Sequence, residues 1–190
     1  GKDKNAKKVV ASLKTISKKN CIDFTKTKTA LALQIPGEHN KMNGRAAYCA
    51  SRALKIETSD ILLQLNQFHG TGRRLESKGI VHGVQVYDDY AHHPTEIKAS
   101  LGALREVHPK SKICVVYQPH QYSRTKKLLK GFGKSFKEAD CVVVPNIYAA
   151  RDTAKEKAAV NVDFLVKEIE KNKVIALNGL GFQKTALYLK

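Results

Sequence analysis

The stretch Val84–Ile97, VQVYDDYAHHPTEI, decides both the expected fold and the expected site. Its first residues predict a strand that ends at Asp88 and Asp89. Pro94 suits the first turn of a helix, because the N–H that proline lacks has no partner there. Two carboxylates, a phenol and two imidazoles therefore lie where a strand gives way to a helix. In open α/β sheets ligands bind at this edge, so the stretch is a candidate site.

Segments that predict strands and helices alternate along the rest of the chain. The sequences ICVVY and CVVVP are almost continuously apolar, as strands covered on both faces are. Strands are expected at 84–89, 113–118, 141–145 and 174–177, and helices at 94–108, 125–136, 162–172 and 182–189. This alternation predicts an α/β fold with a Rossmann-like, doubly wound, mostly parallel sheet and helices on both faces.

Helices dominate the pattern of residues 1–70. A Lys-rich helix or lead is expected at 1–20, a strand at 29–35, and helices at 41–54 and 59–68. One strand offers no sheet for these helices to cover, so this part does not predict a complete domain. The glycines of His69–Gly72 predict a linker to the remaining residues.

The chain is strongly basic, with 34 Lys and Arg against 17 Asp and Glu and a formal charge of +17. Such a charge favours anionic partners, including nucleotides, phosphorylated substrates, nucleic acids and membrane surfaces. Lysine predominates, which is more typical of a solvated surface than of bidentate phosphate recognition. A basic nucleic-acid-binding module stays an alternative on charge alone, since aromatic residues for stacking on bases make up 7% of the chain.

Four cysteines lie far apart and form no C-x-x-C pair. Cys114 and Cys141 fall within apolar runs, so they are expected to pack in the core as small hydrophobic residues. Neither a disulfide framework nor a structural zinc site is indicated, which fits a reducing cytoplasm. No apolar run approaches the roughly 20 residues of a membrane helix, and no signal-peptide core is visible, so no membrane partner is expected.

Further polar clusters accompany the first stretch. Asn40 and Asn43 lie three residues apart at the expected start of a helix, where two amides could bind the edge of a purine or simply cap the helix. Arg74 follows the linker glycines and could contact a phosphate or stay at the surface. Gln118–Thr125, which contains Arg124, ends the next strand. Its polar groups are therefore expected at the same edge of the sheet as the paired aspartates and histidines.

The first stretch also leaves a second chemistry open. Asp88, Asp89, His92 and His93 are residue types that bind metals, and as ligands they would make the chain a metal-dependent hydrolase. Such a grouping is uncommon in a pure core, which favours a functional role. The sequence contains neither a phosphate-binding G-x-x-x-x-G-K-[ST] loop nor a G-x-S-x-G nucleophile turn.

In their order and at their intervals, these motifs resemble those of the Mur ligases, the amide-forming ligases of peptidoglycan synthesis. The motifs are PGxHNxxN at 36–43, GRR at 72–74, DDYAHHPTE at 88–96 and QPHxYSRT at 118–125. The resemblance covers about residues 30–150, and the last motif points to the family member that adds L-alanine. Residues 1–28 and 155–190 match only loosely.

The resemblance implies an ATP-dependent ligase that joins L-alanine to UDP-N-acetylmuramate through an acyl phosphate. It implies that the adenine lies against Asn40 and Asn43, the ribose against Asp89 and the terminal phosphate against Arg74. It surrounds the alanine with Tyr90, His92, His120 and Arg124, and it gives catalytic roles to Arg74, His92 and Arg124. No metal ligand is expected in this chain, because the Mg²⁺ ligands of the family lie in another domain.

The resemblance also implies a division of the chain. Residues 1–70 would be the end of the central ATP-binding domain, and 71–190 the carboxy-terminal amino-acid-binding domain. A complete ligase has an amino-terminal domain for the UDP group and a central phosphate-binding loop, which this sequence does not show, so the chain is expected to be an inactive fragment. Gln121 stands where many relatives have Arg, so alanine recognition is expected to depend more on Arg124.

Overall fold

The computed structural model of the chain describes residues 5, 8, 11–12 and 22–188. The Lys-rich helix expected at 1–20 therefore lies largely outside the described residues. The chain divides into two compact units, with the division between Thr71 and Gly72. No helix in the described ranges is both long enough and apolar enough to cross a bilayer.

The first unit is built on two helices, α2 (Glu38–Ala53) and α3 (Thr58–Asn66), with a short 3₁₀ turn, η2 (Phe24–Lys26), before them. The prediction of a strand at 29–35 is wrong, because this segment pairs with no strand in the part of the chain that the structure describes. Its leucines instead pack on a helix: a Cβ added to Gly44 of α2 would lie 2.8 Å from Leu31 Cδ1 and 3.3 Å from Leu33 Cδ1. Alternating leucines thus cover α2 rather than one face of a sheet.

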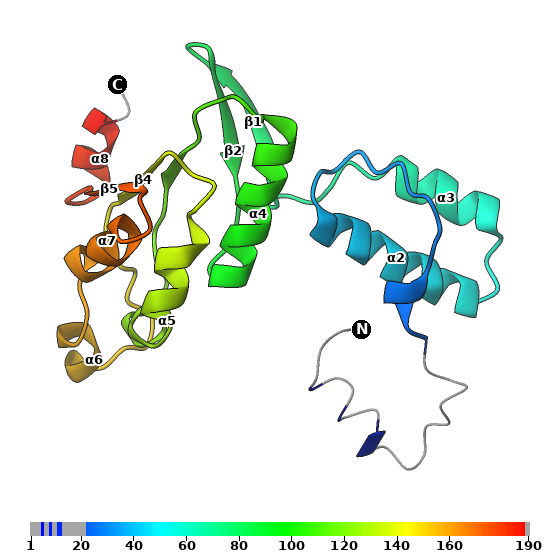
Figure 1. Cartoon of the computed structure of the whole chain (residues 1–190), viewed down its shortest axis with the longest axis horizontal. Helices are drawn as coiled ribbons and strands as arrows, with labels where there is room; N and C mark the ends of the chain where they lie inside the picture. The colour runs from blue at the N-terminus through cyan, green and yellow to red at the C-terminus, as the bar shows by residue number, and fades with distance from the viewer. Residues whose placement is uncertain (1–4, 6–7, 9–10, 13–21, 189–190) are drawn as a thin grey trace. The chain divides into compact units, whose positions relative to one another are not determined.

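The second unit contains a parallel sheet in the order β3-β4-β5, of which Figure 1 labels β4 and β5. The strands are β3 (Cys114–Val116), β4 (Cys141–Val144) and β5 (Ile175–Asn178). They are joined by the crossover helices α5 (Tyr122–Ser135) and α7 (Val162–Glu170), with a short helix α6 (Ala154–Ala158) before α7. The predicted α/β class and parallel sheet are therefore confirmed, because each strand–helix–strand crossover returns the chain in the same direction.

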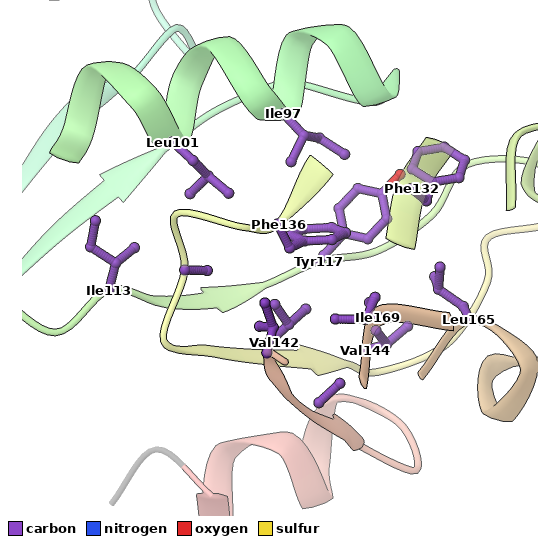
Figure 2. Packing of buried hydrophobic residues seen from close by; sticks show 13 residues of the cluster. Ile97, Leu101, Ile113, Tyr117, Phe132, Phe136, Val142, Val144, Leu165 and Ile169 are labelled. Atoms are coloured by element: carbon purple, nitrogen blue, oxygen red, sulfur yellow. The ribbon is translucent and has the colours of Figure 1, made fainter. Parts of the chain in front are cut away.

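Helices cover both faces of this sheet. The helix α4 (Pro94–Val107) joins α5 and α7 on one face, where its apolar residues meet those of β4 in a single buried cluster (Figure 2). The cluster includes Ile97, Leu101, Phe132, Phe136, Val142, Val144, Leu165 and Ile169. Val143 faces the other side, where Gly179 separates it from Thr185 of α8 (Phe182–Tyr188). The central strand is therefore buried from both sides, which explains its continuous run of valines.

The strand expected at 84–89 forms outside the parallel sheet. Its residues form β2 (Val84–Asp88), which pairs antiparallel with β1 (Glu76–Val81), a strand that the sequence analysis did not predict. The two strands are joined at His82 and Gly83, whose φ angles of 50° and 81° suit the tight turn of a two-residue hairpin. The hairpin still delivers the paired aspartates to the start of α4, because β2 ends one residue before Asp89.

The prediction that Cys114 packs in the core is wrong. Cys114 is exposed and Cys141 is half-buried, and both are free thiols. The reason is that β3 is an edge strand, and Cys114 lies on the face opposite the buried cluster, as does Val116, which is 43% exposed.

Close contact between α5 and α7 gives a test of this packing. A Cβ added to Gly133 of α5 would lie 2.6 Å from the carbonyl oxygen of Glu168 in α7. We expect Gly133→Ala to lower the free energy of unfolding by about 1–3 kcal/mol, because the helices must move apart. Urea denaturation followed by circular dichroism measures this change.

Gly102 of α4 is the matched control, since nothing lies within 4 Å of a Cβ added there. Gly102→Ala is expected to raise the free energy of unfolding by up to about 1 kcal/mol through helix propensity alone. Equal effects of the two substitutions would contradict the packing described here.

Asp140 gives a second test, because its carboxylate accepts hydrogen bonds from Ile113 N (2.8 Å) and from Arg105 Nη2 (3.0 Å). These contacts, with the backbone bond from Ile113 first, hold the pKa of Asp140 below its usual value of 3.8. A lowered folded-state pKa stabilises the fold fully above pH 3.8, and this contribution is lost as the pH falls through the lowered pKa.

We therefore expect Asp140→Asn to lower the melting temperature at pH 7 and to have less effect as the pH is taken below 3.8. Thermal unfolding of both chains across this pH range measures the difference. A difference that stays constant down to the acid limit would show that the Asp140 charge contributes nothing.

Candidate functional site

The first turns of α4 and α5 open onto one pocket of about 420 Å³. It is lined by His93, Ser123, Arg124, Lys127 and Leu128. The helices approach closely, since a Cβ added to Gly131 of α5 would lie 3.1 Å from Pro94 Cγ of α4. The turn with the paired histidines and the turn before Arg124 thus lie at the same edge of the sheet, as the sequence predicts.

A capping box fixes the start of α4. His93 is the N-cap residue, and its Nδ1 accepts a hydrogen bond from Thr95 N at 3.2 Å. The Glu96 carboxylate accepts in return from His92 N at 2.9 Å and from His93 N at 3.1 Å. These bonds satisfy donors of the first helical turn and hold the backbone of both histidines in place.

Glu96 also brings a negative charge to this region. Partial burial raises its pKa, but the backbone hydrogen bonds and the charges of His92 and Arg74 outweigh burial and leave the pKa below its usual value. Glu96 is therefore ionised at neutral pH. Its Oε2 lies 3.6 Å from His92 Nδ1.

The side chain of Asp89 ties the segment before β1 to α4. Its Oδ2 accepts from Leu75 N at 2.8 Å, and its Oδ1 accepts from Ala91 N at 2.8 Å and Ser100 Oγ at 3.2 Å. Asp89 therefore holds the backbone beside Arg74, whose side chain is exposed.

Asp88 has a different partner from Asp89. Its Oδ2 accepts from Arg73 Nε at 3.3 Å. Since His93 caps α4 and His92 turns toward Glu96, the four side chains do not converge. Within the described residues, no group of three or more His, Cys, Asp or Glu side chains could hold a metal ion. The metal-dependent hydrolase alternative is therefore not supported.

Tyr90 and His92 lie together at the surface. Their rings meet edge to face with centroids 5.5 Å apart, and Tyr90 is 50% exposed. The guanidinium of Arg73 lies 4.7 Å from the centre of the Tyr90 ring. His92 Nδ1 is 3.1 Å from the Tyr90 carbonyl oxygen. This pair, which the sequence analysis placed near the substrate, is accessible to a ligand.

The turn before α5 is held by the loop that follows β4. Gln118 Nε2 donates to Asn146 Oδ1 at 2.8 Å, and the rings of His120 and Tyr148 lie 5.0 Å apart. His120 and Tyr148 also form an isolated parallel bridge. His120 thus contacts a neighbouring loop and is half-buried there.

Tyr117 belongs to the buried cluster, where its ring packs against Phe132 and Phe136, and it is 6% exposed. Its hydroxyl has no hydrogen-bond partner among the described residues. Burial raises its pKa, while the charge of Arg124 lowers it and that of Glu96 raises it.

Asn40 and Asn43 belong to the first unit, where both lie near the start of α2. Asn40 Nδ2 donates to the Pro36 carbonyl oxygen at 2.7 Å, and Asn43 is exposed. Asn40 thus has a local structural role. Asn43 keeps an amide at the surface, one helical turn further on.

Two residues of the second unit were not predicted from the sequence to belong to the site. Lys127 lines the pocket because it follows Arg124 by one helical turn, and this i, i+3 spacing was visible in the sequence. Asp152 accepts hydrogen bonds from the first turn of α5, yet it lies about 30 residues away in the chain. Nothing local in the sequence indicates that contact.

Known proteins resemble this chain over most of its length. Residues 73–180 match the sequence profile of the Mur ligase, glutamate ligase domain. A UDP-N-acetylmuramate–L-alanine ligase of Clostridium tetani is 39% identical over 181 residues, which make up 93% of this chain and 39% of that protein. The ligase of the same name from Clostridium acetobutylicum is 43% identical over 160 residues, or 84% of this chain and 34% of that protein. The chain thus spans less than half the length of these relatives.

Solved structures show the same likeness. A UDP-N-acetylmuramate–alanine ligase of Thermotoga maritima superposes with a TM-score of 0.62 and 28% identity, covering 80% of this chain and 32% of that one. A murein peptide ligase of Psychrobacter arcticus, at 22% identity and a TM-score of 0.56 over 88% of this chain and 34% of that one, shares the fold. Since the matching profile spans more than half of the chain, this chain belongs to the Mur ligase family.

Proposed function

We propose that this chain is part of an ATP-dependent ligase that joins L-alanine to UDP-N-acetylmuramate in peptidoglycan synthesis. The observation that carries the proposal is the pocket at the start of α5, whose two cationic side chains, Arg124 and Lys127, suit the carboxylate of an amino acid. The likeness of the chain to UDP-N-acetylmuramate–L-alanine ligases supports the choice of substrates.

Each unit has its own part in the proposal. Residues 1–70 are the end of the central ATP-binding domain, and 71–190 are the amino-acid-binding domain. In the first unit we assign Asn40 and Asn43 to the adenine of ATP. In the second unit we assign Asp89 to the ribose and Arg74 to the terminal phosphate. The free thiols Cys49, Cys114 and Cys141 fit a cytoplasmic location, where thiols stay reduced.

The reaction forms an amide bond at an activated carboxylate. ATP transfers its terminal phosphoryl group to the lactyl carboxylate of UDP-N-acetylmuramate and leaves as ADP. The alanine amine then attacks the carbonyl carbon of the resulting acyl phosphate, which forms the amide bond and expels inorganic phosphate. Arg124 binds the alanine carboxylate with parallel N–H groups, which fixes the direction of the amine. Lys127 adds a second positive charge to the same pocket.

The alanine amine must lose a proton before it can attack. We assign the removal of this proton to His92, whose Nδ1 lies 3.6 Å from the Glu96 carboxylate and whose ring meets that of Tyr90 at the surface. Tyr90 and His120 complete the surroundings of the amino acid. The family uses Mg²⁺ to neutralise phosphate charge, but the described residues offer no cluster of ligands for it, so no step is assigned to the ion here.

A chimeric enzyme tests the function directly. We expect that replacing the matching region of the Clostridium tetani ligase with this chain gives an enzyme that releases ADP only when alanine and UDP-N-acetylmuramate are both present. A coupled ADP assay measures the rate, and the 190-residue chain assayed alone is the control. A folded chimera that releases no ADP above background would refute the proposal.

Substitution of Arg124 tests the assignment of the pocket. We expect Arg124→Gln in the chimera to raise the KM for alanine by about 10- to 100-fold, which corresponds to a charge-assisted hydrogen bond of about 1.5–3 kcal/mol. The KM for ATP is expected to change by less than about twofold, because ATP is bound by other residues.

Lys127→Gln is expected to raise the KM for alanine less, by about 3- to 10-fold, since Lys contributes a point charge rather than a planar fork. Lys130→Gln is the matched control, because Lys130 is an exposed cation of the same helix that does not line the pocket. If Lys130→Gln had the same effect as Lys127→Gln, general electrostatic attraction rather than the pocket would be responsible.

A further inference from the structure

The helix that carries Arg124 does not cap its own first turn. Its N-cap residue, Gln121, has a φ of 76° and forms no side-chain cap hydrogen bond. The first N–H groups of a helix have no partner within the helix, and the helix dipole places partial positive charge there. A helix that begins without a cap frays easily at its first turn, which is where Arg124 lies.

A carboxylate from a distant loop supplies the missing cap. Asp152 Oδ2 accepts from Tyr122 N at 3.0 Å, and its Oδ1 accepts from Ser123 N at 3.0 Å and Ser123 Oγ at 2.8 Å. These bonds, with the one from Ser123 N first, hold the pKa of Asp152 below its usual value. The carboxylate is therefore ionised at neutral pH and lies at the positive end of the α5 dipole.

The loop that carries Asp152 is fixed at both of its ends. Before Asp152, Tyr148 N donates to the Pro119 carbonyl oxygen at 2.9 Å, and Gln121 N donates to the Tyr148 carbonyl oxygen at 2.8 Å. After Asp152, Thr153 and Glu156 form a capping box that starts α6. The carboxylate is thus placed by contacts that do not involve Arg124.

These contacts decide what can hold an anion in the pocket. Because Asp152 occupies the N–H groups of Tyr122 and Ser123, a ligand carboxylate has to be held by the side chains of Arg124 and Lys127. We infer that Asp152 is the positioning residue for Arg124: it fixes the first turn of α5 so that the guanidinium faces the pocket. This inference rests on the proposed function only for the identity of the ligand.

A double-mutant cycle in the chimeric enzyme tests the inference. We expect Asp152→Asn to raise the KM for alanine by about 5- to 20-fold, with the KM for ATP unchanged within about twofold. In an Arg124→Gln background the same substitution is expected to change the KM for alanine by less than twofold, because Asp152 acts through Arg124. Independent, multiplicative effects of the two substitutions would overturn the inference.

Asp163→Asn is the matched control, since Asp163 is an exposed acidic residue in the first turn of α7 that accepts a hydrogen bond from Asn178. It removes the same charge from the same unit but lies outside the pocket. We expect it to leave the KM for alanine within twofold of the parent. An equal rise in KM for both substitutions would show a general charge effect and overturn the inference.

A measurement on the 190-residue chain separates this inference from the proposed function. By amide hydrogen exchange, Asp152→Asn is expected to speed exchange at Tyr122 and Ser123 at least tenfold, while amides of α7 keep their rates. The Nε–H resonance of Arg124 is expected to shift with them. If the chimera were inactive, these two readouts would still decide the inference, and unchanged exchange at Ser123 would overturn it.

Discussion

The packing of helices onto the central strand β4 sets the geometry of the pocket. Val142 and Val144 are completely buried, and Phe132 of α5 and its C-cap residue Phe136 lie in the same cluster (Figure 2). Because protein interiors are close-packed, the positions of α4, α5 and α7 are interdependent. Glycines permit the nearest approaches, since Gly133 faces the α7 backbone and Gly131 faces Pro94. The first turns of α4 and α5 can therefore open onto one pocket.

Carboxylates then fix the helix starts and the segment that surround the pocket. Glu96 holds the start of α4, Asp152 holds the start of α5, and Asp89 ties the Arg74 segment to both β2 and α4. Each accepts from backbone N–H groups rather than mainly from a cation. In a unit with so many lysines, this leaves the positive charge of Arg124 and Lys127 directed toward the pocket, where an anionic ligand can use it.

The parallel sheet and its helices could be predicted because burial leaves a clear mark on sequence. The runs at 113–117 and 141–145 are continuously apolar, and helical spacing follows each of them. Exposed elements leave a weaker mark. β1 has the sequence ESKGIV and is exposed along most of its length, so its only local signal was the His82–Gly83 turn. The leucines near residue 31 alternate as in a strand, yet the surface that they cover is a helix.

The site was predictable to the extent that its residues are consecutive. The motifs at 88–96 and 118–125 lie at the strand ends expected of them, and a pocket joins them. The position of Lys127 in the pocket could have been predicted from the helical period alone, because it follows Arg124 by one turn. Asp152 could not be found from local sequence, because its contact with α5 depends on how the loop after β4 folds back over the loop after β3. A contact of this kind is settled by tertiary structure alone.

The loop from Asn146 to Asp152 has a consequence for how the sequence can vary. It spans a fixed gap, from a strand end to a helix terminus, and is attached at Tyr148 and at Asp152. Adding or removing one residue here would displace the carboxylate by about 3 Å, which is the reach of one residue and exceeds the tolerance of a hydrogen bond. The hairpin turn at His82–Gly83 carries no such attachment in the described structure. Insertions and deletions in related sequences should therefore be found at the hairpin turn and be rare in the loop.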